Sequence, residues 1–401
     1  MAEDFVGARV RFWRLKRALS QQTLAGLAGI SQGYVSQIEA GLKEIDKRST
    51  LVRLADALQV SVADLTGQPY APADAPHARA LAFVPDIRAA LISLAYLDLP
   101  EAPARGVEEL SAATQRLMTA RRTCDYAKAT SLIAPLLRDL GAAAYSPTAT
   151  HRADALRLLT LTTYQAAFVL KYLGFVDLPL AAAERCADAA AELGKPEYVG
   201  LADFARLHNL PSESRSVGRK LATAATERLQ HETAPEALQT YGMLHLTCAW
   251  TEALAGEPAD ARTHLEEAAA VAVRLGEDPP EGGFAEMNFG PTNVAQWRLS
   301  LALETGEPGK AVELARAVDP RRILSNSRRT QFHIEHGAAL AATRRSDGEA
   351  LAQFINAERI APQRVRLSPV VRDNVGTMLR RARVSAGGEH LRELASRVGV
   401  A

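Results

Sequence analysis

Four small residues between positions 20 and 41 constrain the local fold more tightly than any other part of the sequence. Ser20 and Ser31 each precede a short helix-compatible run, and Gly29 and Gly41 follow the ends of those runs. A serine hydroxyl can accept a free backbone N–H of the first helical turn, and glycine accepts the left-handed conformation that ends many helices. The spacing therefore predicts two short helices joined by a tight turn.

The second of these helices has an apolar face and a polar face. Val35 and Ile38 lie three positions apart and can share the inward face. Amides and hydroxyls remain for the outward face, on Gln32, Tyr34, Ser36 and Gln37. A glutamine amide presents a donor beside an acceptor, which matches the major-groove edge of adenine, whereas hydroxyls and N-terminal N–H groups suit phosphates. The pattern is typical of a DNA-reading helix-turn-helix, and a merely polar helical pair is the alternative.

The region of residues 5–67 resembles the Cro/C1-type (XRE-family) helix-turn-helix. The matching runs are Ser20-Gln21-Gln22-Thr23-Leu24-Ala25, Gly29-Ile30-Ser31 and Tyr34-Val35-Ser36-Gln37-Ile38-Glu39-Ala40-Gly41. The resemblance implies a five-helix domain whose last helices are Thr50–Leu58 and Ser61–Leu65. It also implies that Gln21 braces Gln32 and a phosphate, and that Glu39 pairs with Arg14.

The same resemblance assigns the contacts with DNA. Gln32, Gly33, Tyr34 and Gln37 are expected at base edges. The family often has a proline soon after the glycine that ends the third helix, but the stretch 42–48 has none, and its basic residues Lys43, Lys47 and Arg48 are the expected backbone contacts. The DNA-binding set that we predict is Gln21, Ser31, Gln32, Gly33, Tyr34, Ser36, Gln37, Lys43 and Arg48.

Beyond residue 70 the sequence predicts a long all-α domain. Prolines punctuate residues 71–85, which predicts a linker between a DNA-binding domain at 1–70 and a second domain at 86–401. Ala- and Leu-rich stretches with helical spacing follow, separated by similar short breaks at 173–177, 255–260, 305–309 and 346–350. This degenerate repeat resembles the tetratricopeptide (TPR) class and favours an α-solenoid. An irregular helical bundle is the alternative.

A long insertion at residues 276–293 interrupts the repeats and does not resemble a helix. Its first half is acidic and glycine-rich, which is compatible with disorder, and its second half mixes apolar and amide side chains. We predict a ligand site there, formed by Asn288, Phe289, Thr292, Asn293 and Trp297. The alternative is that Thr292 or Asn293 only caps a helix over Val294–Glu304.

Several classes of chemistry find no support in the sequence. The 47 basic and 46 acidic residues nearly balance, which excludes a polyelectrolyte mode of binding. The cysteines Cys124, Cys186 and Cys248 are isolated in apolar runs, and His333-Ile334-Glu335-His336 lacks the order of a zinc motif, so we expect no metal, cofactor or enzyme activity. Arg121-Arg122 and Arg321-Arg322 are expected on solvated faces, whereas Arg328 and Arg329 have the alternative of holding a carboxylate. No leader and no apolar stretch of about 20 residues is present, which predicts a cytoplasmic protein without membrane contact.

The combined plan resembles the long regulators of actinobacteria and the peptide-sensing RRNPP regulators. It implies a transcription regulator that binds a roughly palindromic double-stranded DNA operator as a homodimer, and whose repeat domain binds a small-molecule or peptide signal and mediates dimerisation. Two alternatives remain. The first is a constitutive regulator whose repeat domain binds a protein partner, and the second is an enzyme fused to a DNA-binding domain.

Overall fold

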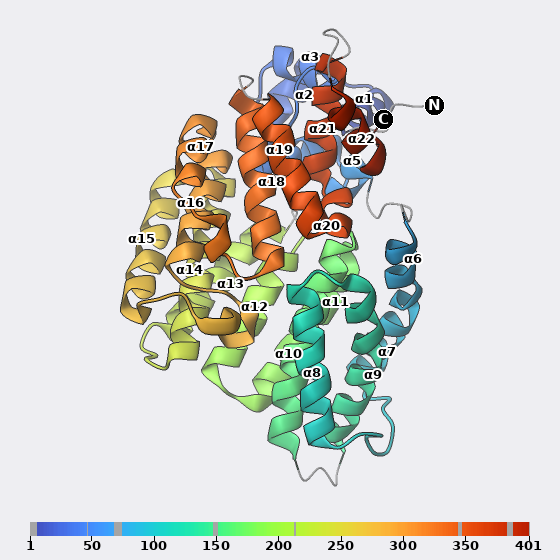
Figure 1. The fold of residues 1–401 in the computed structure, drawn as a ribbon, viewed down its shortest axis with the longest axis vertical. Coiled ribbons are helices and arrows are strands. Elements are labelled where there is room, and N and C mark those ends of the chain that lie inside the picture. Colours follow the sequence, from blue (N-terminus) through green and yellow to red (C-terminus); the bar gives the residue numbers. More distant parts are fainter. Residues whose placement is uncertain are drawn as a thin grey trace.

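The structure is a computed structural model that describes residues 6–45, 47–67, 74–146, 151–211, 214–343, 347–382 and 388–400, and every regular element in these ranges is a helix. Figure 1 shows a small N-terminal part, coloured blue, beside the C-terminal helices of a larger array. We call residues 6–67 the head and the later described residues the body. Across these ranges, no helix has the length and apolarity needed to span a membrane.

The head contains the five helices that the sequence predicts. They are α1 (Val6–Lys16), α2 (Gln21–Ala28), α3 (Gln32–Glu39), α4 (Arg48–Leu58) and α5 (Val62–Thr66). The hydroxyls of Ser20 and Ser31 accept backbone N–H groups at the starts of α2 and α3, and Gly29 ends α2 with a φ of 62°. The predicted caps are therefore confirmed. Apolar side chains from all five helices form one core, which includes Val10, Leu24, Val35, Leu54 and Leu65.

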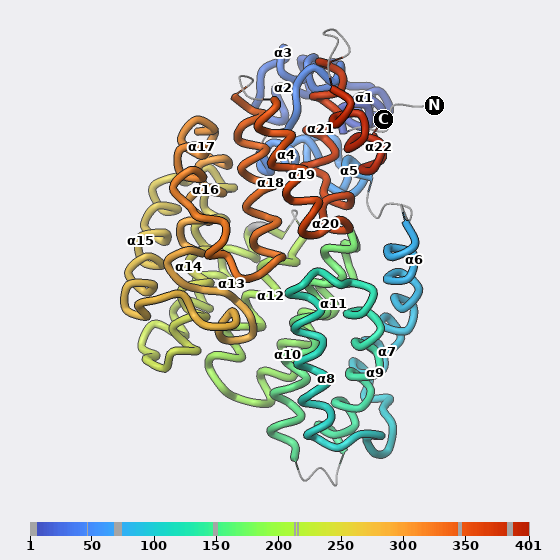
Figure 2. Tube along the Cα trace, in the orientation of Figure 1, coloured from blue at the N-terminus to red at the C-terminus, as the bar shows by residue number. Residues whose placement is uncertain are grey.

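The body is an array of helices that pack mainly against their neighbours along the chain, as in a helical repeat domain (Figure 2). Its helices are α6 (Ala75–Ala82), α7 (Val84–Tyr96), α8 (Val107–Arg122), α9 (Tyr126–Tyr145), α10 (Arg152–Tyr172), α11 (Asp177–Leu193), α12 (Pro196–Asn209), α13 (Arg215–Leu229), α14 (Pro235–Ala255), α15 (Pro258–Leu275), α16 (Pro291–Glu304), α17 (Pro308–Arg316), α18 (Asn326–Thr343), α19 (Asp347–Ile360), α20 (Pro362–Arg366), α21 (Pro369–Ala382) and α22 (Glu389–Arg397). The pairs α10–α11, α14–α15 and α18–α19 lie in the most extensive contact.

The predicted breaks and the predicted linker have different outcomes in the structure. The breaks at 173–177, 255–260 and 305–309 each lie between two helices, as expected, and the break at 346–350 falls partly outside the described residues. The expected linker 71–85 is helical over most of its described part, because Asp74 caps α6 and α7 begins at Val84. Residues 71–73 lie outside the described residues.

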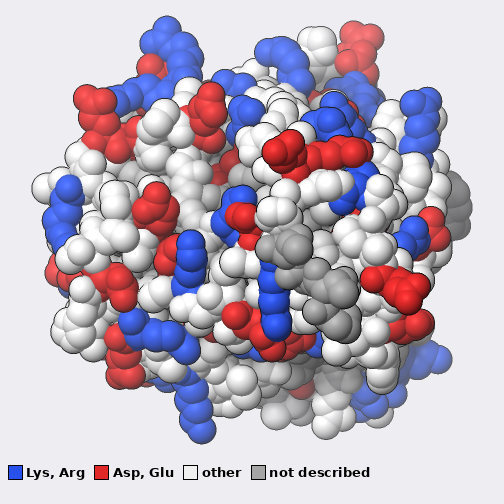
Figure 3. Space-filling view, turned by 90° about the horizontal axis from the view of Figure 1, so that it is seen from below, with Lys and Arg blue, Asp and Glu red and all other residues white. Residues whose placement is uncertain are grey.

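Charges of both signs are mixed over the end of the molecule that lies farthest from the head. Figure 3 views this end from below, and it shows blue and red side chains interspersed without a large area of one sign. The mixture agrees with the balanced composition of 47 basic and 46 acidic residues. This face therefore offers no broad electrostatic surface for nucleic acid.

Candidate DNA-reading surface and candidate signal-binding site

A chain of polar contacts fixes the first residue of the predicted reading helix α3. The Gln32 amide donates to the Gln21 side-chain oxygen over 3.0 Å, and the Gln21 amide donates to Glu39 over 2.9 Å. Glu39 accepts two further hydrogen bonds from Arg14, at 2.6 and 2.8 Å, and these bonds raise the pKa of Arg14. Arg14 and Glu39 are only 8 % and 6 % exposed. The exposed Gln32 is thus tied to a buried ion pair, which confirms the predicted Arg14–Glu39 pair.

The outward face of α3 is accessible. Ser31, Gln32, Gly33 and Gln37 are exposed and Ser36 is half-buried. The remaining predicted residues of this region form its border. The Tyr34 hydroxyl donates to the backbone oxygen of Glu44 over 3.2 Å, and the Lys43 ammonium lies 4.5 Å from the centre of the Tyr34 ring. Tyr34 and Lys43 therefore have a structural role in holding the loop after α3.

Arg48 lies away from this surface. It begins α4, and its backbone N–H and that of Ser49 donate to the Glu304 carboxylate of α16, over 3.0 and 2.9 Å. Its side chain lines a cavity of about 110 Å³ together with Lys171 and Trp250 of the body. In this arrangement Arg48 does not join the other predicted DNA contacts, because its side chain faces the body.

The loop that follows the reading helix is attached to the body at two further points. The Asp373 carboxylate of α21 accepts the backbone N–H of Ile45 over 2.9 Å, and the Arg380 guanidinium donates to the backbone oxygen of Gly41 over 2.7 Å. Gly41 has a φ of 68°, and an added Cβ would lie 2.2 Å from Arg380. Only glycine combines this backbone conformation with so close an approach. The head is consequently docked through its α3–α4 loop.

Within the predicted insertion, residues 280–288 form a segment that we call the strap. It contains the short 3-10 helices η2 (Pro280–Gly282) and η3 (Phe284–Glu286). Four of its non-glycine residues have φ between 50° and 58°, namely Glu281, Ala285, Glu286 and Asn288. Each left-handed residue of this kind costs roughly 1–2 kcal/mol. Contacts with the rest of the body, and not the conformational preferences of its own residues, therefore hold the strap in this conformation.

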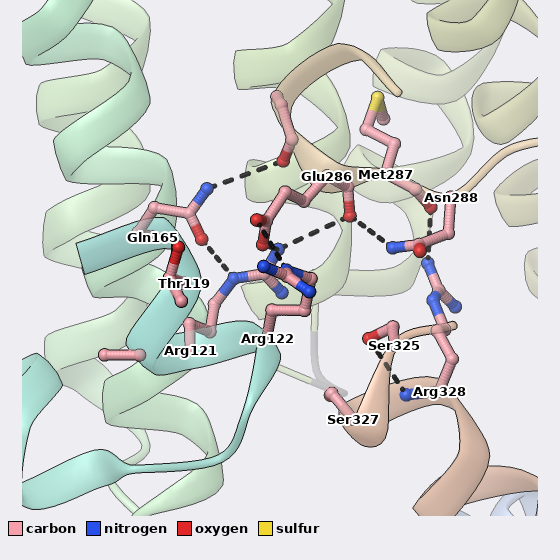
Figure 4. A network of polar contacts seen from close by, with 12 residues as sticks. Thr119, Arg121, Arg122, Gln165, Glu286, Met287, Asn288, Ser325, Ser327 and Arg328 are labelled. Atoms are coloured by element: carbon pink, nitrogen blue, oxygen red, sulfur yellow. Dashed lines mark hydrogen bonds and ion pairs between the residues drawn. The ribbon is translucent and has the colours of Figure 1, made fainter. Parts of the chain in front are cut away.

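Side chains from α8, α10 and α18 hold the centre of the strap (Figure 4). The Glu286 carboxylate is 3.1 Å from Arg122 Nε and 3.9 Å from Arg121 Nη2, both on α8. Burial raises the pKa of Glu286, and the two arginines oppose that rise. The backbone oxygens of Ala285, Glu286 and Met287 accept hydrogen bonds from Gln165 at 3.4 Å, Arg121 at 3.5 Å and Arg328 at 3.2 Å, respectively. The expectation that Arg121 and Arg122 form a solvated face is therefore wrong.

Apolar side chains anchor the strap and its continuation. Met287 and Phe289 are both 0 % exposed, and the Phe289 ring fills the space that a side chain at Gly242 would occupy, since an added Cβ would lie 2.0 Å from the ring. Trp297 is also buried, with its ring edge-on to Trp250 at 6.2 Å between centroids. Phe289 and Trp297 are thus core residues, and neither lines the cavity beside the strap.

That cavity is small, about 30 Å³, and the other three predicted ligand residues line it. They are Asn288, Thr292 and Asn293. Asn293 is 3 % exposed, and neither polar atom of its amide has a protein hydrogen-bond partner. The Nε2 atom of Gln296, which lines the same cavity, is also unpaired. Unpaired buried amides are rare in proteins, and they offer hydrogen bonds to whatever enters the cavity.

The capping role considered for Thr292 and Asn293 is wrong. Helix α16 begins at Pro291, and Gly290 holds its N-cap position without a side-chain bond. The Asp278 carboxylate accepts the backbone N–H of Thr292 over 3.0 Å and also the Thr292 hydroxyl. A residue of the preceding turn thus caps the helix, and Asn293 is left without that role.

The remaining candidates show no assembled chemistry. The three cysteines are free and buried. His333 Nδ1 lies 2.7 Å from the side-chain oxygen of Gln353, and burial lowers the pKa of His333. Among the described residues, no three His, Cys, Asp or Glu side chains gather in a metal-binding arrangement.

One comparison with known proteins identifies the head. Residues 6–66 match the family described as a helix-turn-helix domain. No curated protein matches the chain. Among solved structures, the chain is similar to PlcR of Bacillus thuringiensis in complex with the peptide PapR7 and DNA, with 11 % identity, a TM-score of 0.34, and coverage of 96 % of this chain and 100 % of that chain. It is also similar to the apo form of the competence regulator ComR of Streptococcus vestibularis, with 11 % identity, a TM-score of 0.36 and the same coverage.

Proposed function

We propose that this chain, which carries a helix-turn-helix domain at residues 6–66, is a sequence-specific transcription regulator of the cytoplasm whose body binds a small-molecule or peptide signal. It acts as a homodimer on a roughly palindromic operator. The observation that carries the proposal is the exposed polar face of α3, braced from below by the buried Arg14–Glu39 pair.

The hydrogen bond between Gln32 and Gln21 supports a specific way of recognising a DNA base. Gln32 uses one of its two amide hydrogens on Gln21, which leaves its oxygen and its other hydrogen available. An adenine presents the complementary acceptor and donor side by side in the major groove. Because the contact with Gln21 already orients the amide, little side-chain entropy is lost when the base is bound. Gln37, exposed on the same short helix, is the second reading residue.

The docking of the head supports control by the body. The loop after α3 is held by Asp373 and Arg380 of α21, and the start of α4 by Glu304 of α16. A ligand that moves α16 or α21 therefore changes the position of the reading helix. The cavity beside Asn293 lies at the start of α16, so a ligand bound there contacts one of these two helices directly.

Selection of bound duplexes from a random DNA pool by the full-length protein tests the proposal. We expect one enriched sequence with two related half-sites. Gln32→Ala should weaken binding to that sequence by about 1–3 kcal/mol and leave binding to random DNA nearly unchanged. Gln230→Ala, the same change at an exposed position of the body, is the matched control. A pool without enrichment, or a Gln32→Ala variant with wild-type affinity, would contradict the proposed reading.

A further inference from the structure

We propose that the strap is an internal ligand, and that the groups which hold it are the binding site for an acidic peptide. This inference rests on the proposed function, because it names the class of signal that the body binds. A peptide with a carboxylate between apolar residues would compete with Glu286 and with the strap backbone for the same partners. The strap occupies the site in the structure described here.

Side chains of the body bind the strap through its backbone. Three consecutive carbonyl oxygens, from Ala285 to Met287, each accept a hydrogen bond from a side chain of a different helix, since Gln165, Arg121 and Arg328 belong to α10, α8 and α18. Side-chain donors directed at successive carbonyls recognise a peptide backbone whatever its sequence. The strap is thus bound as a separate peptide would be.

The site is also selective for a carboxylate. Arg121 and Arg122 both approach Glu286, whose side chain is almost completely buried. The orientation of Arg121 is fixed from the other side, because its Nε donates to Gln165. If a neutral side chain replaces the carboxylate, the positive charges of the two oriented guanidinium groups have no partner. The site therefore discriminates strongly against neutral peptides.

The residues on either side of the carboxylate contact the body as well. Phe284 meets Tyr198 edge-on at 5.1 Å between ring centroids, and Met287 is fully buried with its sulfur 3.8 Å from the Thr240 hydroxyl. A ligand that replaces the strap therefore needs an aromatic residue two positions before its acidic residue and an apolar residue one position after it.

A competing peptide has two advantages over the strap. Ala285 and Glu286 are held in the left-handed region, whereas an untethered peptide is free of the chain connections that impose this strain on the strap. The Asn293 amide, unpaired beside the strap, also offers hydrogen bonds that the strap does not make. Both differences favour exchange of the strap for a ligand.

The test uses the full-length protein and a fluorescent synthetic peptide that reproduces residues 281–289. Glu286→Gln removes the strap charge, and we expect this variant to bind the peptide at least about tenfold more tightly than the wild type does, because the strap competes less well. Adding Arg122→Met to Glu286→Gln should abolish the gain. Arg116→Met, a change to an exposed arginine of the same helix, should preserve it.

Two further probes identify what is recognised. A peptide with glutamine in place of the glutamate that corresponds to Glu286 should bind at least about tenfold more weakly, and acetate at the same concentration should not displace the labelled peptide. Equal binding of both peptides, or failure of the folded Glu286→Gln variant to bind either one, would overturn the proposal. Operator binding is measured on the same samples, and it reports the proposed function independently of the peptide result.

If Glu286→Gln does not fold, the wild type provides the decisive measurement. Excess peptide should accelerate amide hydrogen exchange at residues 284–288, because the displaced strap loses its protection. Unchanged exchange at a peptide concentration that saturates binding would show that the peptide binds elsewhere, and the proposal would be wrong.

Discussion

Asn293 illustrates at the scale of one residue what the sequence can and cannot indicate. Its position before an apolar helical run favours an N-cap, but Pro291 starts the helix earlier, in agreement with the preference of proline for the first helical turn. The capping carboxylate comes from Asp278, which lies 14 positions before Thr292. Such a contact depends on how the preceding turn folds back, so the local pattern could not reveal it.

The two residues should therefore respond differently to substitution. Asp278→Ala should lower the free energy of unfolding by about 1 kcal/mol, because α16 loses its cap. Asn293→Ala removes an amide without a protein partner and should leave the melting temperature nearly unchanged, while it abolishes the response of operator binding to an inducing extract. Thermal melting and operator binding of both variants give the comparison. If the melting temperature of the Asn293→Ala variant is lower than that of the Asp278→Ala variant, the Asn293 amide has a structural role.

Because the pKa of Lys171 is lowered in the folded protein, we predict that the free energy of unfolding depends on pH. Burial, together with the positive charges of the neighbouring Arg48 and Arg364, lowers this pKa to about 7. Between pH 7 and the ordinary value of 10.5, the unfolded chain holds this proton and the folded chain has released it, so the free energy of unfolding rises with pH. Below pH 7 Lys171 is charged in both the folded and the unfolded state, and the folded state is destabilised by the full cost of burying that charge.

Lys171→Met should remove that cost. We expect its melting temperature to exceed that of the wild type by about 2–4 °C at pH 6, and the difference to shrink as the pH approaches 10. Lys128→Met, at an exposed lysine, should show no such trend. A constant difference over the whole range would mean that the charge of Lys171 does not set the effect.

At the scale of elements, the sequence predicts a structure well where the interacting residues are close in sequence, and poorly where they are far apart. The head helices could be predicted because Ser20, Ser31 and Gly29 act on their own helices. The strap could not be predicted, because Arg122 and Glu286 are 164 positions apart and four of its residues with positive φ are not glycines. The sequence indicated only that an ordered segment with amides was present there.

The start of α4 provides a test of docking between elements. Lys47 makes no side-chain cap, and Glu304 of the body accepts the first N–H groups of the helix instead. Glu304→Ala should accelerate hydrogen exchange at Arg48 and Ser49 by about fivefold or more, since the loss of a cap costs about 1 kcal/mol. Glu307→Ala removes an exposed carboxylate from the same turn and is the control. Equal exchange in both variants would show that the head does not depend on Glu304.

At the scale of the whole molecule, one reading helix contacts only a few base pairs, so a specific operator requires a second head. We predict a homodimer formed by the body. The head offers a competing interface, because Phe12, Leu15, Leu27 and Leu42 are exposed. Sedimentation of the full-length protein should show a dimer that persists when Phe12 and Leu15 are both replaced by serine. A monomeric double variant would assign the interface to the head.

The strap also determines how fast the protein can respond. Its carbonyls and its carboxylate occupy the same donors that an incoming peptide needs, so entry must wait until those bonds open. The association rate should then stop rising with peptide concentration and level off at the opening rate of the strap. If the peptide is present for less time than the strap takes to open, it would not bind. If it is present for longer, it would displace the strap and bind. The same buried contacts that give selectivity would therefore make the regulator a filter for the duration of its signal.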